Sequence, residues 1–174
     1  MIIITAVGND HPGMAHAVAQ RLAEADCNIE DTTMTRLSGE FAMILIVSPP
    51  ATVTPETLSH VLEPLRHSHG LFISCNRIDD ERAEPEPGER WMLSVYGPEK
   101  RGLVAHITGV LAAHKANITD VQTRVASGGA LYVMMFQIEL AAGTTINALR
   151  LALNNAAHDL GVQSSLHPLE EDTL

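Results

Sequence analysis

The sequence predicts an α+β fold in which one βαββαβ unit occurs twice in tandem. Two glycine-bounded turns 89 residues apart indicate the repeat, and each turn follows a β-branched apolar run and precedes a run with helical spacing. A repeat of nearly half the chain length indicates two copies of one domain, because solenoid repeats have periods of about 20–50 residues. With the first turn laid on the second, the identical pairs are Gly8/Gly97, Gly13/Gly102, Leu22/Leu111, Ala23/Ala112, Asn28/Asn117, Ile29/Ile118 and Asp31/Asp120.

In the first copy, residues 2–7 are apolar and β-branched, which is typical of a strand. Asp10 is positioned to cap the following helix and Pro12 suits its first turn. Residues 28–37 and 40–48 then predict a hairpin around Ser38-Gly39. A second helix begins after Thr54, and residues 71–78 form the closing strand. Apolar residues at helical spacing indicate both helices. They are Met14, Val18, Leu22 and Ala25 in the first helix and Leu58, Val61, Leu62 and Leu65 in the second.

The second copy predicts the same elements in the same order. They are a strand at 91–96, a helix at 102–115, a hairpin at 117–125 and 131–140 around Ser127-Gly128-Gly129, a helix at 145–160 and a strand at 162–166. This order is that of the ferredoxin-like fold, an antiparallel sheet with helices on one face. The predicted organisation is a first domain at 1–79, an acidic, proline-containing linker at 80–89, a second domain at 90–168 and a tail at 169–174.

The central strands of the two copies are apolar on both faces. Residues 41–47 and 130–136 contain almost no polar side chain, whereas a half-solvated antiparallel strand alternates. We therefore expect the second sheet face to be covered by the other copy, by a second chain or by a partner, and we expect a homo-oligomer. The alternative is an apolar surface that a small domain tolerates.

Composition excludes several classes of protein. The formal net charge is −10 and no run of Lys or Arg occurs, which argues against direct binding of nucleic acid. The chain has no signal-peptide pattern and no apolar run near the roughly 18 residues of a membrane span, so we expect a cytoplasmic protein. Cys27 and Cys75 form no C-x-x-C motif, and buried thiols in a reducing compartment are expected.

The repeated turn suits a small anion. A strand–loop–helix junction presents backbone N–H groups at the positive end of the helix dipole. Asp10 and Glu99 precede the turn glycines and could accept from an ammonium group, while Asn28 and Asn117 carry amides that donate and accept together. From the residues alone, a structural role for the glycine, the cap and the asparagine remains the open alternative.

The stretch GNDHPGMAHAVAQRLAEADCNIED resembles the ACT domain, a regulatory module with the ferredoxin-like fold. Two such repeats, with CNIEDTTMTRLSGEFAMILIV in the first, look most like the glycine cleavage system transcriptional repressor group. The resemblance implies effector sites framed by the turn and the Asn-Ile pair, often between two ACT units. It assigns ligand contact to Asp10, His11, Pro12, Gly13, Asn28 and Ile29, and to Glu99, Gly102, Asn117 and Ile118 in the second copy.

Two departures from the ACT pattern stand out. Lys100-Arg101 replaces His11-Pro12 in the second copy. Some amino-acid-binding ACT units carry a histidine near the end of the first strand, where this chain has Gly8 or Gly97.

Other chemistry is less well supported by the residues. His67-Ser68-His69 lacks a further ligand at a recognisable metal spacing, and no Walker, dinucleotide-binding or nucleophile-elbow motif occurs. Arg101 is the nearest candidate for an acylphosphatase-like phosphate site, without a matching asparagine. A regulatory piece of a formyltetrahydrofolate deformylase is disfavoured because both copies resemble ACT domains.

The sequence thus predicts a non-enzymatic regulator without a cofactor. The resemblance implies that it senses a small amino acid such as glycine or serine at ACT interfaces and modulates a partner transcription regulator. The alternative hypothesis is a ligand-independent interaction module that assembles through its apolar sheet faces.

Overall fold

The computed structural model describes residues 1–78, 88–126, 131–141 and 143–169. The chain divides into two compact units, Met1–Ala83 and Glu84–Leu174, and each is described by itself. Residues 80–87 of the predicted linker, the predicted turn at 127–129 and residues 170–174 of the predicted tail lie outside the described residues. Glu89, expected as the last linker residue, is instead the first residue of a strand.

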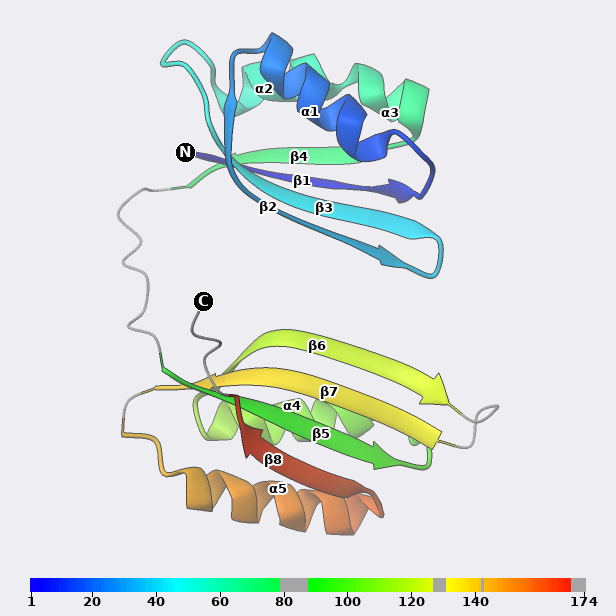
Figure 1. The fold of residues 1–174 in the computed structure, drawn as a ribbon, viewed down its shortest axis with the longest axis vertical. Helices are drawn as coiled ribbons and strands as arrows, with labels where there is room; N and C mark the ends of the chain where they lie inside the picture. Colours follow the sequence, from blue (N-terminus) through cyan, green and yellow to red (C-terminus); the bar gives the residue numbers. More distant parts are fainter. Residues whose placement is uncertain (79–87, 127–130, 142, 170–174) are drawn as a thin grey trace. The chain divides into compact units, whose positions relative to one another are not determined.

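Unit 1 is a four-stranded antiparallel sheet with its helices on one face (Figure 1). The strand order β2-β3-β1-β4 places β1 and β3 in the centre and leaves β2 and β4 at the edges. Side chains such as Ile4, Leu22 and Leu45 fill an aliphatic core between sheet and helices. The elements are β1 (Ile2–Asn9), α1 (Met14–Glu24), β2 (Asn28–Leu37), β3 (Glu40–Ser48), α2 (Pro55–Leu62), α3 (Pro64–His69) and β4 (Phe72–Arg77).

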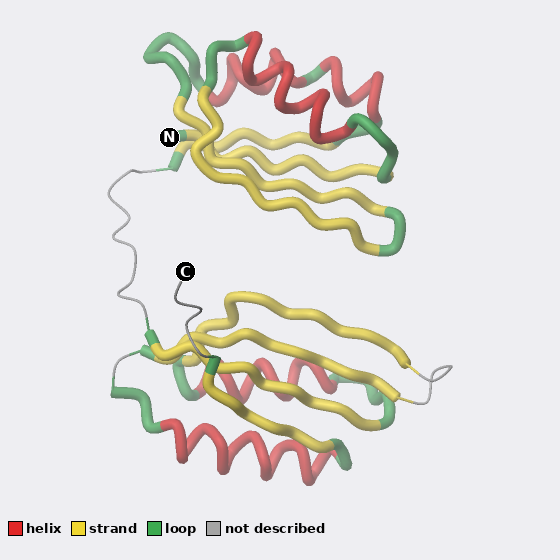
Figure 2. Tube along the Cα trace, in the orientation of Figure 1, coloured by secondary structure: helices red, strands yellow, loops and turns green. Residues whose placement is uncertain are grey.

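Unit 2 repeats this architecture, with its helices on one face of the sheet (Figure 2), and its strand order is β6-β7-β5-β8. The two units confirm the predicted α+β fold of tandem βαββαβ domains. The longest described helix, α5, has 15 residues, and no helix within the described ranges is long and apolar enough to cross a membrane. The elements are β5 (Glu89–Gly97), α4 (Leu103–Ala113), β6 (Ala116–Ala126), β7 (Leu131–Leu140), α5 (Ile146–Leu160) and β8 (Gln163–Pro168).

The repeat extends to irregular backbone. The strand after the first helix has a register shift between Ile29 and Asp31 in unit 1 and between Ile118 and Asp120 in unit 2. The residues before these strands, Asp26 and Lys115, have positive φ angles of 57° and 55° at equivalent places. The two units therefore share local backbone conformation as well as topology.

Two local predictions in unit 1 were wrong. Asp10 does not cap α1, because Gly13 occupies the N-cap in a left-handed conformation and no side chain caps the helix. The single helix predicted after Thr54 is two helices, because Pro64 has no N–H to continue the first one and begins the second. Thr54 caps the first of the two, its hydroxyl accepting from the Thr57 N–H at 3.2 Å.

The outer sheet face of unit 1, opposite its helices, carries exposed apolar side chains. Along β3, Phe41, Met43, Leu45 and Val47 are buried toward the helices. On the other face Val7, Ile44 and Phe72 are 41%, 42% and 68% exposed. The covering predicted for this face stays a prediction, and the exposed side chains mark where a partner would pack.

Both cysteines are free and lie in unit 1. Cys27 is buried, and burial, with smaller effects from Asp26 and Cys75, raises the pKa of its thiol. Burial also raises the pKa of Cys75, which is half-buried. Both thiols are therefore poor nucleophiles near neutral pH.

Candidate functional site

Each candidate turn ends in a glycine that its backbone requires. Gly13 and Gly102 have φ angles of 99° and 83°, a left-handed conformation that L side chains rarely adopt. They form the N-caps of α1 and α4, and neither helix has an acidic residue in its first turn. The first N–H groups of a helix have no i−4 partner within it. At the second turn the Leu103 N–H donates to Lys100 O at 3.3 Å, which leaves the next N–H groups of α4 as donors to an anion.

A hollow of about 460 Å³ opens at the second turn. Glu99 contributes a carboxylate to its wall, and the start of α4 contributes backbone N–H groups. Within the described part of the chain, no side chain or backbone group donates a hydrogen bond to the Glu99 carboxylate. The volume falls in the range of small-molecule sites. The lining residues are Glu99, Lys100, Gly102, Leu103, Val104, Ala105 and Tyr132.

Sequence reasoning missed Tyr132 as part of this hollow. Tyr132 lies near the start of β7 and pairs with Gly97, the residue that ends β5. Only the register of the sheet brings it beside the turn, and the motif itself gives no sign of it.

At the first turn, the protein itself engages the predicted polar residues. The carboxylate of Asp10 accepts a hydrogen bond from the Arg36 guanidinium at 3.4 Å, and the Asp10 backbone N–H donates to Gly39 O at 2.8 Å. The imidazole of His11 stacks on that of His69 with ring centroids 5.6 Å apart. The first turn is thus tied to the β2–β3 hairpin and to the end of α3.

His11 and Lys100 occupy equivalent positions and make equivalent contacts. His11 Nε2 lies 3.3 Å from His69 O, and Lys100 Nζ donates to Leu160 O at 2.5 Å. His69 and Leu160 are the last residues of α3 and α5, where carbonyl groups lack helical partners. A donor there also opposes the negative end of the helix dipole. Both residues therefore fasten the turn to the last helix of their unit.

We expect Lys100→Met to lower the free energy of unfolding by about 0.5–1 kcal/mol, because it removes an exposed cation from a helix C-terminus. Arg101→Met is the matched control, since Arg101 lies exposed in the same turn and no hydrogen bond or ion pair joins its side chain to a described residue. The midpoint of urea unfolding measures both effects. Equal midpoints for the two variants would contradict a fastening role for Lys100.

The turn and the asparagine of one unit lie at opposite ends of its sheet. In unit 1, Asn28 pairs with Ser48, whereas Asn9, beside the turn, pairs with Glu40. These partners are eight positions apart along β3, which is about 27 Å of strand. A similar separation holds in unit 2. The predicted site residues therefore form two groups in each unit, and no single unit brings them together.

The Asn-Ile pairs differ in what they offer a ligand. The Asn28 amide donates to Glu30 at 2.9 Å, and this bond, with one from Ser48, lowers the pKa of the Glu30 carboxyl. Asn117 is exposed, and no described residue forms a hydrogen bond with its side chain. Ile29 and Ile118 pack against the cores of their units.

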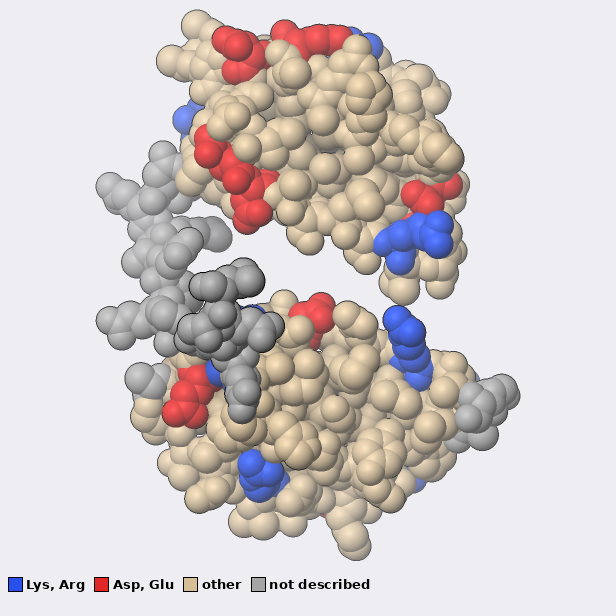
Figure 3. Space-filling view, viewed as in Figure 1, with Lys and Arg blue, Asp and Glu red and all other residues tan. Residues whose placement is uncertain are grey.

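Charged side chains are sparse on the face of the molecule drawn in Figure 3. Lys and Arg are scattered there and form no continuous basic patch. Among the described residues, no group of three His, Cys, Asp or Glu side chains is placed to hold a metal ion.

Comparison with known proteins finds relatives of the whole chain and relatives of part of it. The glycine cleavage system transcriptional repressor of Escherichia coli (strain K12) is 25% identical over 171 residues, covering 95% of this chain and 88% of that protein. The UPF0237 protein MK1213 of Methanopyrus kandleri is 36% identical over 74 residues, covering 42% of this chain and 80% of that protein. The crystal structure of an unknown protein from Galdieria sulphuraria matches with a TM-score of 0.80 and 26% identity, covering 97% of this chain and 98% of that one.

The family assignment rests on both halves of the sequence. The ACT domain pattern matches residues 1–76 and again residues 89–167. These two ranges correspond to the two βαββαβ units and include both glycine-bounded turns. The chain therefore belongs to the ACT domain family and consists of two ACT domains in tandem.

Proposed function

We propose that this ACT protein is a non-enzymatic regulator that binds a small amino acid at its second turn and thereby modulates a protein that regulates transcription. The observation that carries the proposal is the hollow at Glu99–Gly102, where an unengaged carboxylate lies beside an open helix N-terminus. We place this activity in the cytoplasm.

The two ends of an amino acid have complementary groups in this hollow. An α-ammonium would bind the Glu99 carboxylate, and an α-carboxylate would accept from backbone N–H groups at the start of α4. The relation to a repressor of the glycine cleavage system favours glycine, and serine is close to it in size. No cofactor enters this scheme.

A complete site needs a second ACT domain. Asn117 lies at the far end of the sheet from the turn of its own unit, so its amide reaches a bound amino acid only when it comes from another copy. This supports a homo-oligomer with the effector between ACT domains. A ligand that contacts two domains prefers the arrangement that joins them, and such a preference is what shifts a conformational equilibrium.

The output of the sensor passes through a protein partner rather than through DNA. A net charge of −10 repels the phosphate backbone. A coupling free energy of about 1–3 kcal/mol between effector and partner is enough for a switch.

The test is thermal unfolding against each of the twenty amino acids at millimolar concentration. A ligand at 100 times its Kd stabilises the folded state by about 2.7 kcal/mol, which raises the Tm by several degrees at about 2–4 °C per kcal/mol. We expect a shift for glycine or serine that Glu99→Gln abolishes. Asp10→Asn is the matched control, because Asp10 is bound to Arg36.

A different pattern of shifts would change the assignment. A shift lost in Asp10→Asn and kept in Glu99→Gln would move the site to the first turn. If no amino acid shifts the Tm, the result favours the second candidate function, which is a ligand-independent interaction module. The exposed apolar face of unit 1, with Val7, Ile44 and Phe72, favours that candidate.

A further inference from the structure

A second cavity of unit 2 lies between α5 and β8. Its volume is about 190 Å³, several times the roughly 30 Å³ that one water molecule occupies in the liquid. None of its lining residues is Asp or Glu, and none of them lines the hollow at the second turn. Leucine side chains form its apolar part, and its polar lining residues are Arg150, Asn154, Ser164, Ser165 and His167.

Two hydrogen bonds between α5 and β8 fix the polar wall of this cleft. Arg150 and Asn154 are four residues apart on α5 and therefore lie on one face of the helix. The Arg150 guanidinium donates to Leu166 O at 3.0 Å. Ser164 Oγ donates to Asn154 Oδ1 at 3.2 Å, which leaves the Asn154 amide N–H groups as donors. Because these bonds already restrain both side chains, a ligand that they bind orders little more of the protein.

The open edge of β8 adds a backbone donor. Leu169 N donates to Arg90 O, and pairs in an antiparallel ladder alternate between bonded and non-bonded. This alternation directs the N–H and C=O of Leu166 away from β5, and the bond from Arg150 to Leu166 O agrees with that direction. Strand β8 ends the sheet order, so no other described strand takes the Leu166 N–H.

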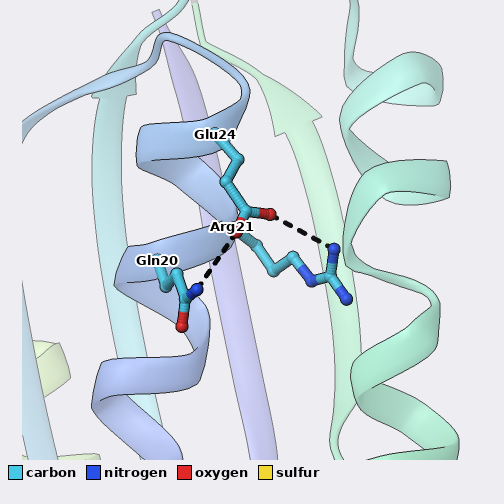
Figure 4. A network of polar contacts seen from close by, with 3 residues as sticks. All are labelled: Gln20, Arg21 and Glu24. Carbon is cyan, nitrogen blue, oxygen red and sulfur yellow. Dashed lines mark hydrogen bonds and ion pairs between the residues drawn. The ribbon is translucent and has the colours of Figure 1, made fainter.

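Arg150 is a cation without an internal counter-ion. A guanidinium has five N–H donors, and within the described ranges Leu166 O is the one acceptor that hydrogen-bonds to it, while no carboxylate forms an ion pair with it. On α1, by contrast, Arg21 is neutralised by Glu24 at 3.2 Å (Figure 4). In a chain with a net charge of −10, an arginine left unpaired in a cleft is available to an external anion.

The equivalent place in unit 1 has different chemistry. Counted from the N-caps of α2 and α5, Ser59 takes the place of Arg150. Glu63 takes the place of Asn154 in the same way, and its carboxylate would repel an anion. The donor set therefore belongs to unit 2 and is not required by the ACT fold.

The donors of this cleft suit a tetrahedral oxyanion. A planar carboxylate is satisfied by a guanidinium alone in a bidentate pair, whereas here an amide on α5 and a backbone N–H on β8 stand beside the guanidinium. Phosphate offers acceptors in several directions and more than one negative charge. We propose that the α5–β8 cleft binds a phosphate group, either the free ion or the phosphoryl group of a small metabolite. Arg150 supplies the charge, Asn154 and the Leu166 N–H donate to further oxygens, and Ser164 orients Asn154.

Titration with inorganic phosphate tests the proposal, and Trp91 reports the result. Trp91 is the single tryptophan of the chain, and the Arg150 guanidinium lies 5.9 Å from its ring centroid. We expect a saturable change in tryptophan fluorescence when sodium phosphate replaces sodium chloride at constant ionic strength, and isothermal titration calorimetry should give the same Kd. Glycerol 3-phosphate in a parallel titration separates the two sources. Tighter binding than inorganic phosphate assigns the cleft to a phosphorylated metabolite, and weaker binding assigns it to the free ion.

Two substitutions remove binding in different ways. We expect Arg150→Gln to weaken phosphate binding by at least about tenfold, because it removes the charge-assisted hydrogen bonds. Asn154→Glu introduces the carboxylate that unit 1 has at Glu63 and should weaken binding at least as much, although the guanidinium stays in place. Arg66→Gln is the matched control and should leave the Kd unchanged, because Arg66 also lies against an aromatic ring but is paired with Glu63 at 3.7 Å.

Several results would overturn this site. They are a fluorescence signal that does not saturate at millimolar phosphate, an unchanged Kd for Asn154→Glu, and a loss in Arg66→Gln equal to that in Arg150→Gln, which would indicate a diffuse charge effect. Acetate binding as tightly as phosphate would refute the assignment to a tetrahedral oxyanion. Far-UV circular dichroism confirms that each variant is folded, and Asn154→Glu decides the matter if Arg150→Gln is not. The titrations contain no amino acid, so their result is independent of the function proposed above.

Discussion

Replacing Phe136 with alanine is expected to lower the free energy of unfolding by about 3–5 kcal/mol, as for other buried aromatic residues. Phe136 lies on β7, a central strand of unit 2, and is fully buried. It pairs with Leu93 across the sheet and belongs to the core cluster that contains Ile107 and Leu149. The cost is large because aromatics are only 3% of the chain, so an aliphatic core has few large side chains to close the cavity.

Phe72→Ala is the matched control for this substitution. Phe72 is 68% exposed at the edge of unit 1, with the Arg66 guanidinium 5.6 Å from its ring centroid. We expect a loss of no more than about 1 kcal/mol, the value of an exposed cation–π contact. Urea unfolding followed by circular dichroism compares the two variants. A cost for Phe72→Ala as large as that for Phe136→Ala would show that the outer face of unit 1 is covered in solution.

Local chemistry explains which elements the sequence could predict. The hairpin at 28–37 and 40–48 was predicted to the residue, because Ser38-Gly39 marks the turn, apolar residues mark β3, and Thr32, Thr33 and Thr35 make β2 rich in β-branched residues. The break at Pro64 was visible in the sequence and was missed, because helical spacing continues through Leu65 across it. The Asp10 cap was wrong because the left-handed Gly13 ends the turn three residues later.

The candidate site could be predicted only in part, because some of its features depend on tertiary structure. The repeat locates both turns, and the glycines identify the two helix N-caps. The distance of Asn117 from its own turn depends on strand register, as does the entry of Tyr132 into the hollow. The fastening of Lys100 to Leu160 spans 60 residues and has no local sign in the sequence.

Gly8→Ala is expected to destabilise the protein by about 1–3 kcal/mol, the usual cost of forcing extra volume into a packed site. A Cβ at Gly8 would lie 2.7 Å from Gly70 O, a backbone atom that cannot swing away as a side chain can. Gly70 is the left-handed C-cap of α3, so its carbonyl is held by the end of the helix. Gly97 is in the equivalent position, where an added Cβ would lie 2.7 Å from Val162 Cγ1.

Gly109→Ala is the control, and we expect it to change the free energy of unfolding in the opposite direction. Gly109 lies within α4, a Cβ there would meet no atom within 4 Å, and alanine should stabilise the helix by about 0.5–1 kcal/mol. The same urea titration resolves the two directions. If Gly8→Ala is as stable as the wild-type chain, the α3–β4 connection can retreat from the end of β1. If it is destabilised, the backbone at Gly70 closes the position where some amino-acid-binding ACT units carry a histidine, and the effector site proposed above would have to take its polar contacts from other residues.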